Sequence, residues 1–414
     1  MRSRKTALGL TVLALFALMT ITKSTRVEAQ TEKILHNFND NGKDGLTPDS
    51  NLTFDKAGNL YGTTRVGGLY NAGTVFRLTP TTGGGWSERV LHSFNNNGKD
   101  GVNPYGGVIL DSSGNVYGTT YFGGAYGYGT VFELIPQEGG GWPEKTLHSF
   151  NNTGTDGEYP FGSLIFDAVG NFYGTTVLAA DEHVGAVFEL KRTAGGGWAE
   201  KTVFTFSGDG TGVLPYAGLV FDAVGNLYGT TSSGGSQGGG TVFELSPAPS
   251  GNWTQSILYN FDDNGTDGYD PVAGLIFDSS GNLYGTTFEG GINGGGMVFQ
   301  LSPASDGSWT ETALYNFGGT GDGSIPSYGT LNFDTAGNLY GMTIAGGTYG
   351  EGTLFKLTPE TGGDWTETML HSFGRSEDGD GPFAGLIFDA AGNLYGTTQS
   401  GGKSTVGTVF EIAP

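Results

Sequence analysis

The sequence predicts an all-β fold, a seven-bladed β-propeller of four-stranded antiparallel blades. Three observations predict it. A motif of the form Gly-Asn-Leu-Tyr-Gly-Thr-Thr occurs seven times, each repeat contains four strand-like segments, and the last repeat lacks a fourth segment that is present at the start of the chain. A length of 414 residues alone would suggest two or three ordinary domains, but a repeat of this kind predicts a single repeat architecture and takes precedence.

The motif returns at intervals of 55 or 56 residues and covers the chain beyond its first residues, which predicts one propeller domain over residues 30–414. Its copies begin at Gly58, Gly114, Gly170, Gly225, Gly281, Gly337 and Gly392. In the second repeat the predicted strands are 107–111, 115–120, 129–134 and 145–150. Each is rich in β-branched or aromatic residues and is bounded by Gly, Pro, Asn or Asp. Four such strands per unit are typical of a propeller blade.

The ends of the chain predict how the ring closes. The last repeat stops after its third strand, at 410–412, whereas the N-terminal segment 32–38 matches the fourth strand 367–373 of the sixth repeat. We therefore expect the N-terminal segment to complete the last blade. This pairing would remove a free sheet edge, which otherwise invites aggregation.

The first residues resemble a secretory signal, predicted over residues 1–29. A basic start (Arg2, Arg4 and Lys5) precedes an apolar run, 6–22, and a small-residue cleavage site at 27–29. Cleavage would leave a secreted, extracellular or cell-surface protein beginning at Gln30. The alternative is an uncleaved anchor, although 17 residues are short for a membrane span. No other long apolar run occurs, so no span is expected after cleavage.

The charge of the chain excludes some partners. The formal net charge is −22, and without the basic signal it is near −26. Nucleic acids are bound through Lys and Arg, so this balance argues against nucleic acid and against anionic membranes. It favours neutral or cationic partners, or divalent ions. The chain has no Cys, hence no disulfides and no cysteine nucleophile.

Asp-x-x-Gly-Asn joins the first two predicted strands of all seven repeats. Asp accepts backbone hydrogen bonds in turns and Gly supplies a positive φ, so these Asp residues are interpreted as turn residues and not ligands. The phrases at 385–398 (Gly-Leu-Ile-Phe-Asp-Ala-Ala-Gly-Asn-Leu-Tyr-Gly-Thr-Thr) and 129–134 (Gly-Thr-Val-Phe-Glu-Leu) resemble the Gloeo/Verruco tandem-repeat family of exported bacterial proteins. The resemblance covers nearly all of 31–414 and implies an extracellular or surface location, but no activity.

The loops that lead from one repeat to the next are acidic. They should share one face with the loops after the second strands, and form an acidic rim there. Calcium prefers carboxylate and carbonyl oxygens, so we consider a weak calcium site in these loops; the alternative is a set of solvated turns. The candidate ligands are Asp40, Asp44, Asp100, Asp156 and Asp267.

Further along these loops, a Pro is followed by an aromatic residue in five repeats, with Tyr328 displaced by one position. Because this position precedes the innermost strand, we expect it to surround the mouth of the central channel. The candidates could stack on a sugar or pack between blades. They are Tyr105, Phe161, Tyr216, Tyr328 and Phe383, with Asp49 and Val272 in the two remaining repeats.

The residue after Gly-Thr-Thr also varies, and Arg65 and Tyr121 are further candidate ligand contacts. The third repeat departs most, with Asp181, Glu182 and His183 where others have a Gly-Gly loop. His183 and two acids could bind a metal or transfer protons; the alternative is a degenerate loop. The remaining histidines, His36, His92, His148 and His371, share one strand position with Tyr and Phe, so we interpret them as packing residues.

The sequence contains no Gly-x-Ser-x-Gly elbow and no distinct phosphate-binding motif. We therefore expect a secreted, monomeric, non-catalytic binding or scaffold protein that recognises a glycan or an extracellular protein through its loop-rich acidic face. The alternative is an extracellular polysaccharide-active hydrolase or lyase that uses rim carboxylates, with calcium as a cofactor.

Overall fold

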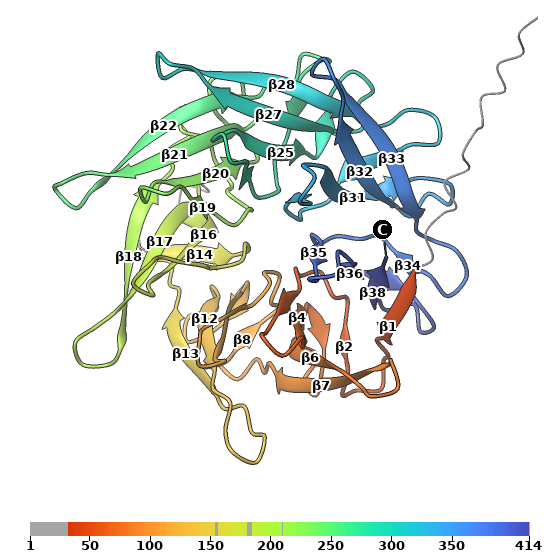
Figure 1. Ribbon diagram of the computed structural model, residues 1–414. Helices are drawn as coiled ribbons and strands as arrows, with labels where there is room; N and C mark the ends of the chain where they lie inside the picture. The colour runs from red at the N-terminus through yellow and green to blue at the C-terminus, as the bar shows by residue number, and fades with distance from the viewer. Residues whose placement is uncertain (1–31, 154–155, 180–183, 209, 414) are drawn as a thin grey trace, which may run out of the picture.

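The computed structural model describes residues 32–153, 156–179, 184–208 and 210–413. Seven small antiparallel sheets form a ring around a central axis (Figure 1). The predicted seven-bladed propeller is therefore confirmed. The described residues contain no helix. They therefore contain no helix that is long and apolar enough to cross a membrane. The expected signal, residues 1–29, lies outside the described part of the chain.

We number the blades 1 to 7 in chain order, from an innermost strand of two residues to a longer outer strand. Blade 1 contains β3 (Thr53–Phe54), β4 (Leu60–Thr64), β6 (Thr74–Pro80) and β7 (Trp86–Ser93). Blade 2 contains β9 (Ile109–Leu110), β10 (Val116–Thr120), β12 (Thr130–Leu134) and β13 (Glu144–Ser149). Blade 3 contains β15 (Ile165–Phe166), β16 (Phe172–Ala179), β17 (Ala186–Arg192) and β18 (Trp198–Thr205). Blades 4 to 7 contain β19 (Val220–Phe221), β20 (Leu227–Thr231), β21 (Thr241–Pro247), β22 (Trp253–Asn260); β24 (Ile276–Phe277), β25 (Leu283–Thr287), β27 (Met297–Pro303), β28 (Trp309–Asn316); β30 (Asn332–Phe333), β31 (Leu339–Gly346), β32 (Thr353–Pro359), β33 (Trp365–Ser372); β35 (Ile387–Phe388), β36 (Leu394–Thr398), β38 (Thr408–Ile412) and β1 (Lys33–Asn37).

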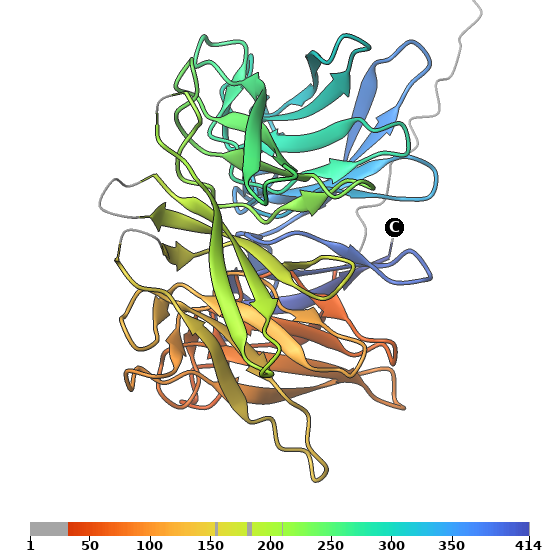
Figure 2. The same cartoon turned by 90° about the vertical axis from the view of Figure 1, so that its left-hand side faces the viewer.

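Additional short strands tie the loop entering a blade to the loop that follows its second strand. Both loop families therefore emerge on one side of the ring, which we call the loop face; Figure 2 shows the ring from the side. The sequence did not predict these strands. They are β2 (Gly45–Leu46) with β5 (Val66–Gly67), β8 (Gly101–Val102) with β11 (Phe122–Gly123), β23 (Gly268–Tyr269) with β26 (Glu289–Gly290), β34 (Gly379–Asp380) with β37 (Ser400–Gly401), β14 (Gly157–Pro160) with β16, and β29 (Gly323–Pro326) with β31.

The ring closes as the two chain ends predict. β1 pairs antiparallel with β38 and becomes the outer strand of blade 7, where Lys33 lies opposite Glu411 and Asn37 opposite Thr408. The Lys33 ammonium donates to the Glu411 carboxylate at 2.6 Å. In Figure 1 the first strand lies beside the last one. The two ends of the described chain thus share a sheet.

Two local features of the repeat explain its residues. In the turn of blade 2, the Asp111 carboxylate accepts hydrogen bonds from the backbone N–H groups of Ser113 and Asn115, at 2.8 and 2.9 Å. The expected turn role of this Asp is confirmed. In the second strand, a Cβ on Gly118 would lie 2.7 Å from the Phe132 ring, so a larger residue would force that ring out of its place.

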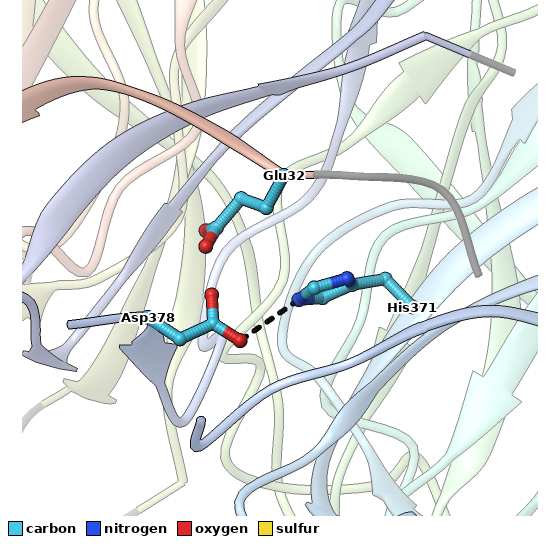
Figure 3. Close-up of side chains that lie close together, drawn as sticks. All are labelled: Glu32, His371 and Asp378. Carbon is cyan, nitrogen blue, oxygen red and sulfur yellow. Dashed lines mark hydrogen bonds and ion pairs between the residues drawn. The ribbon is translucent and has the colours of Figure 1, made fainter. Parts of the chain in front are cut away.

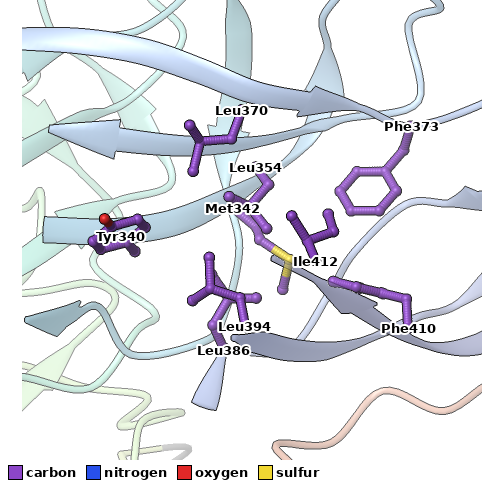
Figure 4. Close-up of a cluster of buried hydrophobic side chains, with 9 residues drawn as sticks. All are labelled: Tyr340, Met342, Leu354, Leu370, Phe373, Leu386, Leu394, Phe410 and Ile412. Carbon is purple, nitrogen blue, oxygen red and sulfur yellow. The ribbon is translucent and has the colours of Figure 1, made fainter. Parts of the chain in front are cut away.

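The hydrophobic core consists of layers between blades, because each sheet buries both of its faces against its neighbours. The β4, β10, β20, β25 and β36 strands are buried at every position. One such layer is shown in Figure 4, where Tyr340, Met342 and Leu354 of blade 6 meet Leu394 and Phe410 of blade 7. The last of these layers, between blades 7 and 1, contains Phe38.

This arrangement predicts the effect of Phe38→Ala. The side chain is fully buried at the closing junction and meets Phe76 edge-on at 5.2 Å. Loss of its ring leaves a cavity where the first and last repeats meet, and we expect the free energy of unfolding to fall by about 3–5 kcal/mol. Denaturant titration of the folded protein measures this. Phe122→Ala is the matched control, because Phe122 is 42% exposed; equal effects of the two substitutions would contradict the prediction.

Candidate binding site at the mouth of the channel

The segments that lead into the innermost strands converge around the axis of the ring. They enclose a cavity of about 180 Å³. In six of the seven repeats, the residue directly after the repeated Pro forms part of the wall of this cavity. In repeat 6 the residue two positions after the Pro takes this role. The structure thus brings seven sequence-identified residues to one site: Asp49, Tyr105, Phe161, Tyr216, Val272, Tyr328 and Phe383.

A left-handed residue before the Pro turns the chain toward the axis. Its φ is between 52° and 60° in six repeats, at Thr47, Asn103, Tyr159, Leu214, Asp270 and Ile325, and Gly381 takes the place in the seventh. This conformation costs a non-Gly residue about 1–2 kcal/mol. The β-branched Thr47 and Ile325 adopt it nevertheless, because hydrogen bonds fix the backbone there. Ile325 lies between two paired residues of β29, whereas the N–H of Thr47 donates to Val406 and its carbonyl accepts from the Arg65 N–H.

The mouth aromatics pack on one another around the axis. Tyr105 stacks on Phe161 with ring centroids 4.7 Å apart, and Tyr328 stacks on Phe383 at 4.3 Å. Phe161 of blade 3 also meets Tyr328 of blade 6, at 5.7 Å. Tyr216 meets Phe161 edge-on at 5.3 Å. All five rings are half-buried and form an arc across the mouth, so they contact each other and still present surface to the cavity.

The first repeat places an ion pair beside this arc. Asp49 is buried, and its carboxylate lies 3.0 Å from Nε of Arg65. Burial raises the pKa of Asp49 to about 6, although Arg65 and a hydrogen bond from Gln399 act in the opposite direction. The Arg65 guanidinium also lies over the Tyr105 ring, 5.6 Å from its centroid, within range of a cation–π contact. The mouth therefore has one polar, charged side and one aromatic side.

Three more residues belong to the site. Tyr121 joins the arc, with its ring 5.4 Å from Tyr105 and stacked at 5.0 Å on Tyr159. Sequence reasoning missed Tyr159 and Asp270, both of which occupy the left-handed position before Pro. Burial raises the pKa of Asp270, and this carboxylate acts electrostatically on Tyr216 and Tyr328. The position before Pro was the signal that could have found them. His183, with Asp181 and Glu182, lies outside the described residues.

The candidate calcium ligands do not come together. Asp40 is exposed, whereas Asp44, Asp100, Asp156 and Asp267 lie in four different loops between blades. Asp44 shows what these carboxylates do: it accepts hydrogen bonds from the Asn39 amide side chain at 2.7 Å and from the Gly45 N–H at 2.8 Å. Their first role is to hold the loop that enters the next blade.

The histidines do more than pack. His36 meets the Phe38 ring edge-on at 4.6 Å, as a packing residue would. However, its Nε2 also lies 3.3 Å from the Asp44 carboxylate, and His92 pairs in the same way with Asp100 at 3.0 Å. Where Tyr takes this position, the Tyr259 hydroxyl donates to Asp267 at 3.0 Å. Exchange between His and Tyr therefore preserves a hydrogen bond as well as a ring, which corrects the interpretation of these histidines as packing alone.

The pKa of Asp49 predicts a pH dependence. Burial raises this pKa to about 6, so protonation favours the folded state. The contribution of Asp49 to stability is then complete below about pH 4 and is lost as the pH rises through about 6. Relative to Asp49→Asn, the wild-type free energy of unfolding should fall by about 1–3 kcal/mol across this interval. Parallel urea titrations of the two proteins measure it; a constant difference from acid to neutral pH would contradict the shift.

Comparison with known proteins agrees with the repeat. No curated protein matches the sequence. Solved structures similar to it include a putative oxidoreductase (glucose dehydrogenase) from Thermus thermophilus, with 17% identity, a TM-score of 0.43 and coverage of 74% of this chain and 95% of that one. A luciferin-regenerating enzyme has 12% identity, a TM-score of 0.43 and coverage of 74% and 90%. These similarities assign no activity to this chain. The model of the Gloeobacter/Verrucomicrobia repeat matches residues 18–237, 86–276 and 215–414, and the chain belongs to this repeat family.

Proposed function

We propose that this propeller is a secreted, non-catalytic binding protein that recognises a glycan, and that the terminal sugar of the glycan enters the mouth of the channel. The observation that carries the proposal is the asymmetric mouth. Five half-buried aromatic rings and the buried Asp49, which pairs with the half-buried Arg65, surround one cavity on the loop face.

The chemistry of the mouth suits a sugar ring. Aromatic faces pack against the C–H groups of a sugar, whereas Asp49, Arg65 and Gln399 can exchange hydrogen bonds with its hydroxyls. A ligand cavity needs an apolar lining with a few placed polar groups, and this one has both. The net charge of −22 favours a neutral or cationic glycan over an anionic one.

The size of the cavity supports a small ligand group. At about 180 Å³ it is below the range of about 300–1,000 Å³ for drug-sized ligands. It suits one terminal ring better than the side of a long polymer. An extracellular protein that carries such a sugar would bind through the same site.

A second candidate function is hydrolysis or elimination at the same mouth. It is favoured by the two carboxylates with raised pKa values, Asp49 in blade 1 and Asp270 in blade 5. A carboxyl group whose pKa is raised by burial is suited to act as a general acid. This candidate differs from the expected rim carboxylates, because it uses Asp49 in the wall of the cavity and Asp270, which acts on the mouth residues Tyr216 and Tyr328.

Binding is tested with a panel of plant and bacterial polysaccharides and their oligosaccharides, using the folded protein. We expect retention on at least one glycan, and a loss of affinity of about 10–100-fold in Tyr105→Ala or Phe161→Ala, because each removes a stacking surface. Tyr126→Ala is the matched control: Tyr126 is 62% exposed and is not in the cavity wall. Thermal unfolding of each variant verifies that it is folded.

The same panel separates the two candidates. Retention without products, unchanged in Asp270→Asn, supports a binding protein. Release of reducing ends or unsaturated products, abolished in Asp270→Asn, supports the enzyme. No retention and no product on any glycan would contradict both.

A further inference from the structure

The junctions between neighbouring blades contain clusters of potential metal ligands, far from the channel mouth. Each cluster takes a His from the outer strand of one blade, an Asp from the loop that follows it, and a Glu from the outer edge of the next blade. In three clusters of the described residues the donor atoms lie within 4.8 Å of one another. These junction clusters are Glu32–His371–Asp378, His36–Asp44–Glu88 and His148–Asp156–Glu200.

The donor atoms are close to the spacing that a metal ion requires. His371 Nε2 and the Asp378 carboxylate are 3.0 Å apart, and the same pair in the His148 cluster is also at 3.0 Å. Two ligands of a tetrahedral zinc ion, at bonds of about 2.0–2.2 Å, lie about 3.4 Å apart. Figure 3 shows the Glu32 carboxylate directed toward Asp378, beside the His371 ring. Small movements of the Glu side chains would bring the third donor into range.

In two of the three clusters the third carboxylate has an oxygen without a hydrogen-bond partner, whereas Glu200 in the third cluster accepts a hydrogen bond from the Thr202 hydroxyl at 3.3 Å. Oε1 of Glu32 and Oε1 of Glu88 are buried and accept no hydrogen bond within the described structure. The donor oxygens of Glu88 and Asp44 lie within 4.8 Å of each other, as do those of Glu200 and Asp156. Two carboxylates held together away from water favour either a proton or a cation between them. A divalent ion would satisfy the orphan oxygen and neutralise both charges.

We propose that the three junction clusters bind divalent transition-metal ions of the zinc class between neighbouring blades. An imidazole nitrogen with two carboxylates is a donor set for zinc, whereas calcium takes six to eight oxygen ligands. The ion replaces the proton that Nε2 and the Asp carboxylate share, and this proton is released to solvent. Ions can enter from the surface, because the Glu32 and Glu88 clusters line grooves of about 570 and 670 Å³.

The repeat itself provides a version of the junction without the imidazole. Between blades 4 and 5 the equivalent residues are Tyr259, Asp267 and Glu311, and Oε1 of Glu311 is again buried without a hydrogen bond. A neutral phenol is a poor ligand for zinc, so this junction should not bind the ion. The chain therefore folds with either His or Tyr at this position. A His→Tyr substitution should preserve the fold and remove the imidazole ligand of the metal.

The Glu32 cluster also links metal binding to ring closure. Glu32 directly precedes β1, whereas His371 and Asp378 belong to β33 and to the loop that enters blade 7. An ion there would fasten the N-terminal strand to blade 6 in addition to its pairing with β38. Zinc should thus raise the thermal unfolding temperature of the ring, because an ion bound only by the folded state stabilises it.

The test uses chelator-treated, full-length folded protein in equilibrium dialysis with Zn²⁺, followed by metal analysis. We expect wild type to take up three equivalents in the three clusters. His36→Tyr should lose one equivalent, and the combined His36→Tyr, His148→Tyr and His371→Tyr variant should lose all three. Tyr259→Phe is the matched control and should lose none, since it changes the same strand position in a junction without an imidazole. Circular dichroism verifies the fold of each variant.

Thermal unfolding gives a second, independent measurement. Zn²⁺ should raise the unfolding temperature of wild type and of Tyr259→Phe, and leave that of the triple variant unchanged. Uptake in the triple variant equal to that of wild type would overturn the proposal, as would the absence of uptake by wild type. Stabilisation by Ca²⁺ but not by Zn²⁺ would overturn the assignment of the ion.

Discussion

The burial of both faces of every sheet is the constraint on which the rest of this structure depends. A four-stranded blade cannot cover its own apolar surfaces, so each blade requires a neighbour on both sides. A ring satisfies this requirement for all seven blades only if its ends meet. The pairing of β1 with β38, and the layer around Phe38 between blades 7 and 1, provide that last contact. A propeller with its closing strand removed would leave both a sheet edge and an apolar face in water.

The same symmetry makes the mouth a place where repeats can differ. Seven equivalent positions converge on one axis, and the packing of the blades does not dictate which residues occupy them. Five repeats place an aromatic ring there, the first places Asp49, and the fifth places Val272. One side of the mouth is thus charged, since Asp49 forms an ion pair with Arg65 of the neighbouring loop. An asymmetric ligand can be recognised by a nearly symmetric scaffold for this reason.

The junctions between blades show how polar groups are managed in such a fold. At six of the seven entrances to a blade, an Asp holds its own loop through backbone hydrogen bonds, and a His or Tyr of the preceding blade is a further partner. The entrance to blade 4 has Thr211 and Phe204 at these two positions instead. The Glu from the next outer strand then meets a carboxylate that is already present. The raised pKa values of Glu88 and Glu200 follow from burial in this geometry and not from any feature of those residues in the sequence.

The sequence by itself determined the repeat, the number of blades, the turn role of the repeated Asp and the closure by the N-terminal strand. These are consequences of local propensity and of a period that the chain repeats seven times. It also identified the position after Pro as the wall of the channel, because that position precedes the innermost strand. Only the tertiary structure decided that Asp49 pairs with Arg65, that Asp270 reaches the mouth, and that Glu88 joins His36 and Asp44. Those contacts bring together residues of different repeats, whose side chains meet through the curvature of the ring, and no pattern along a single strand encodes their distance.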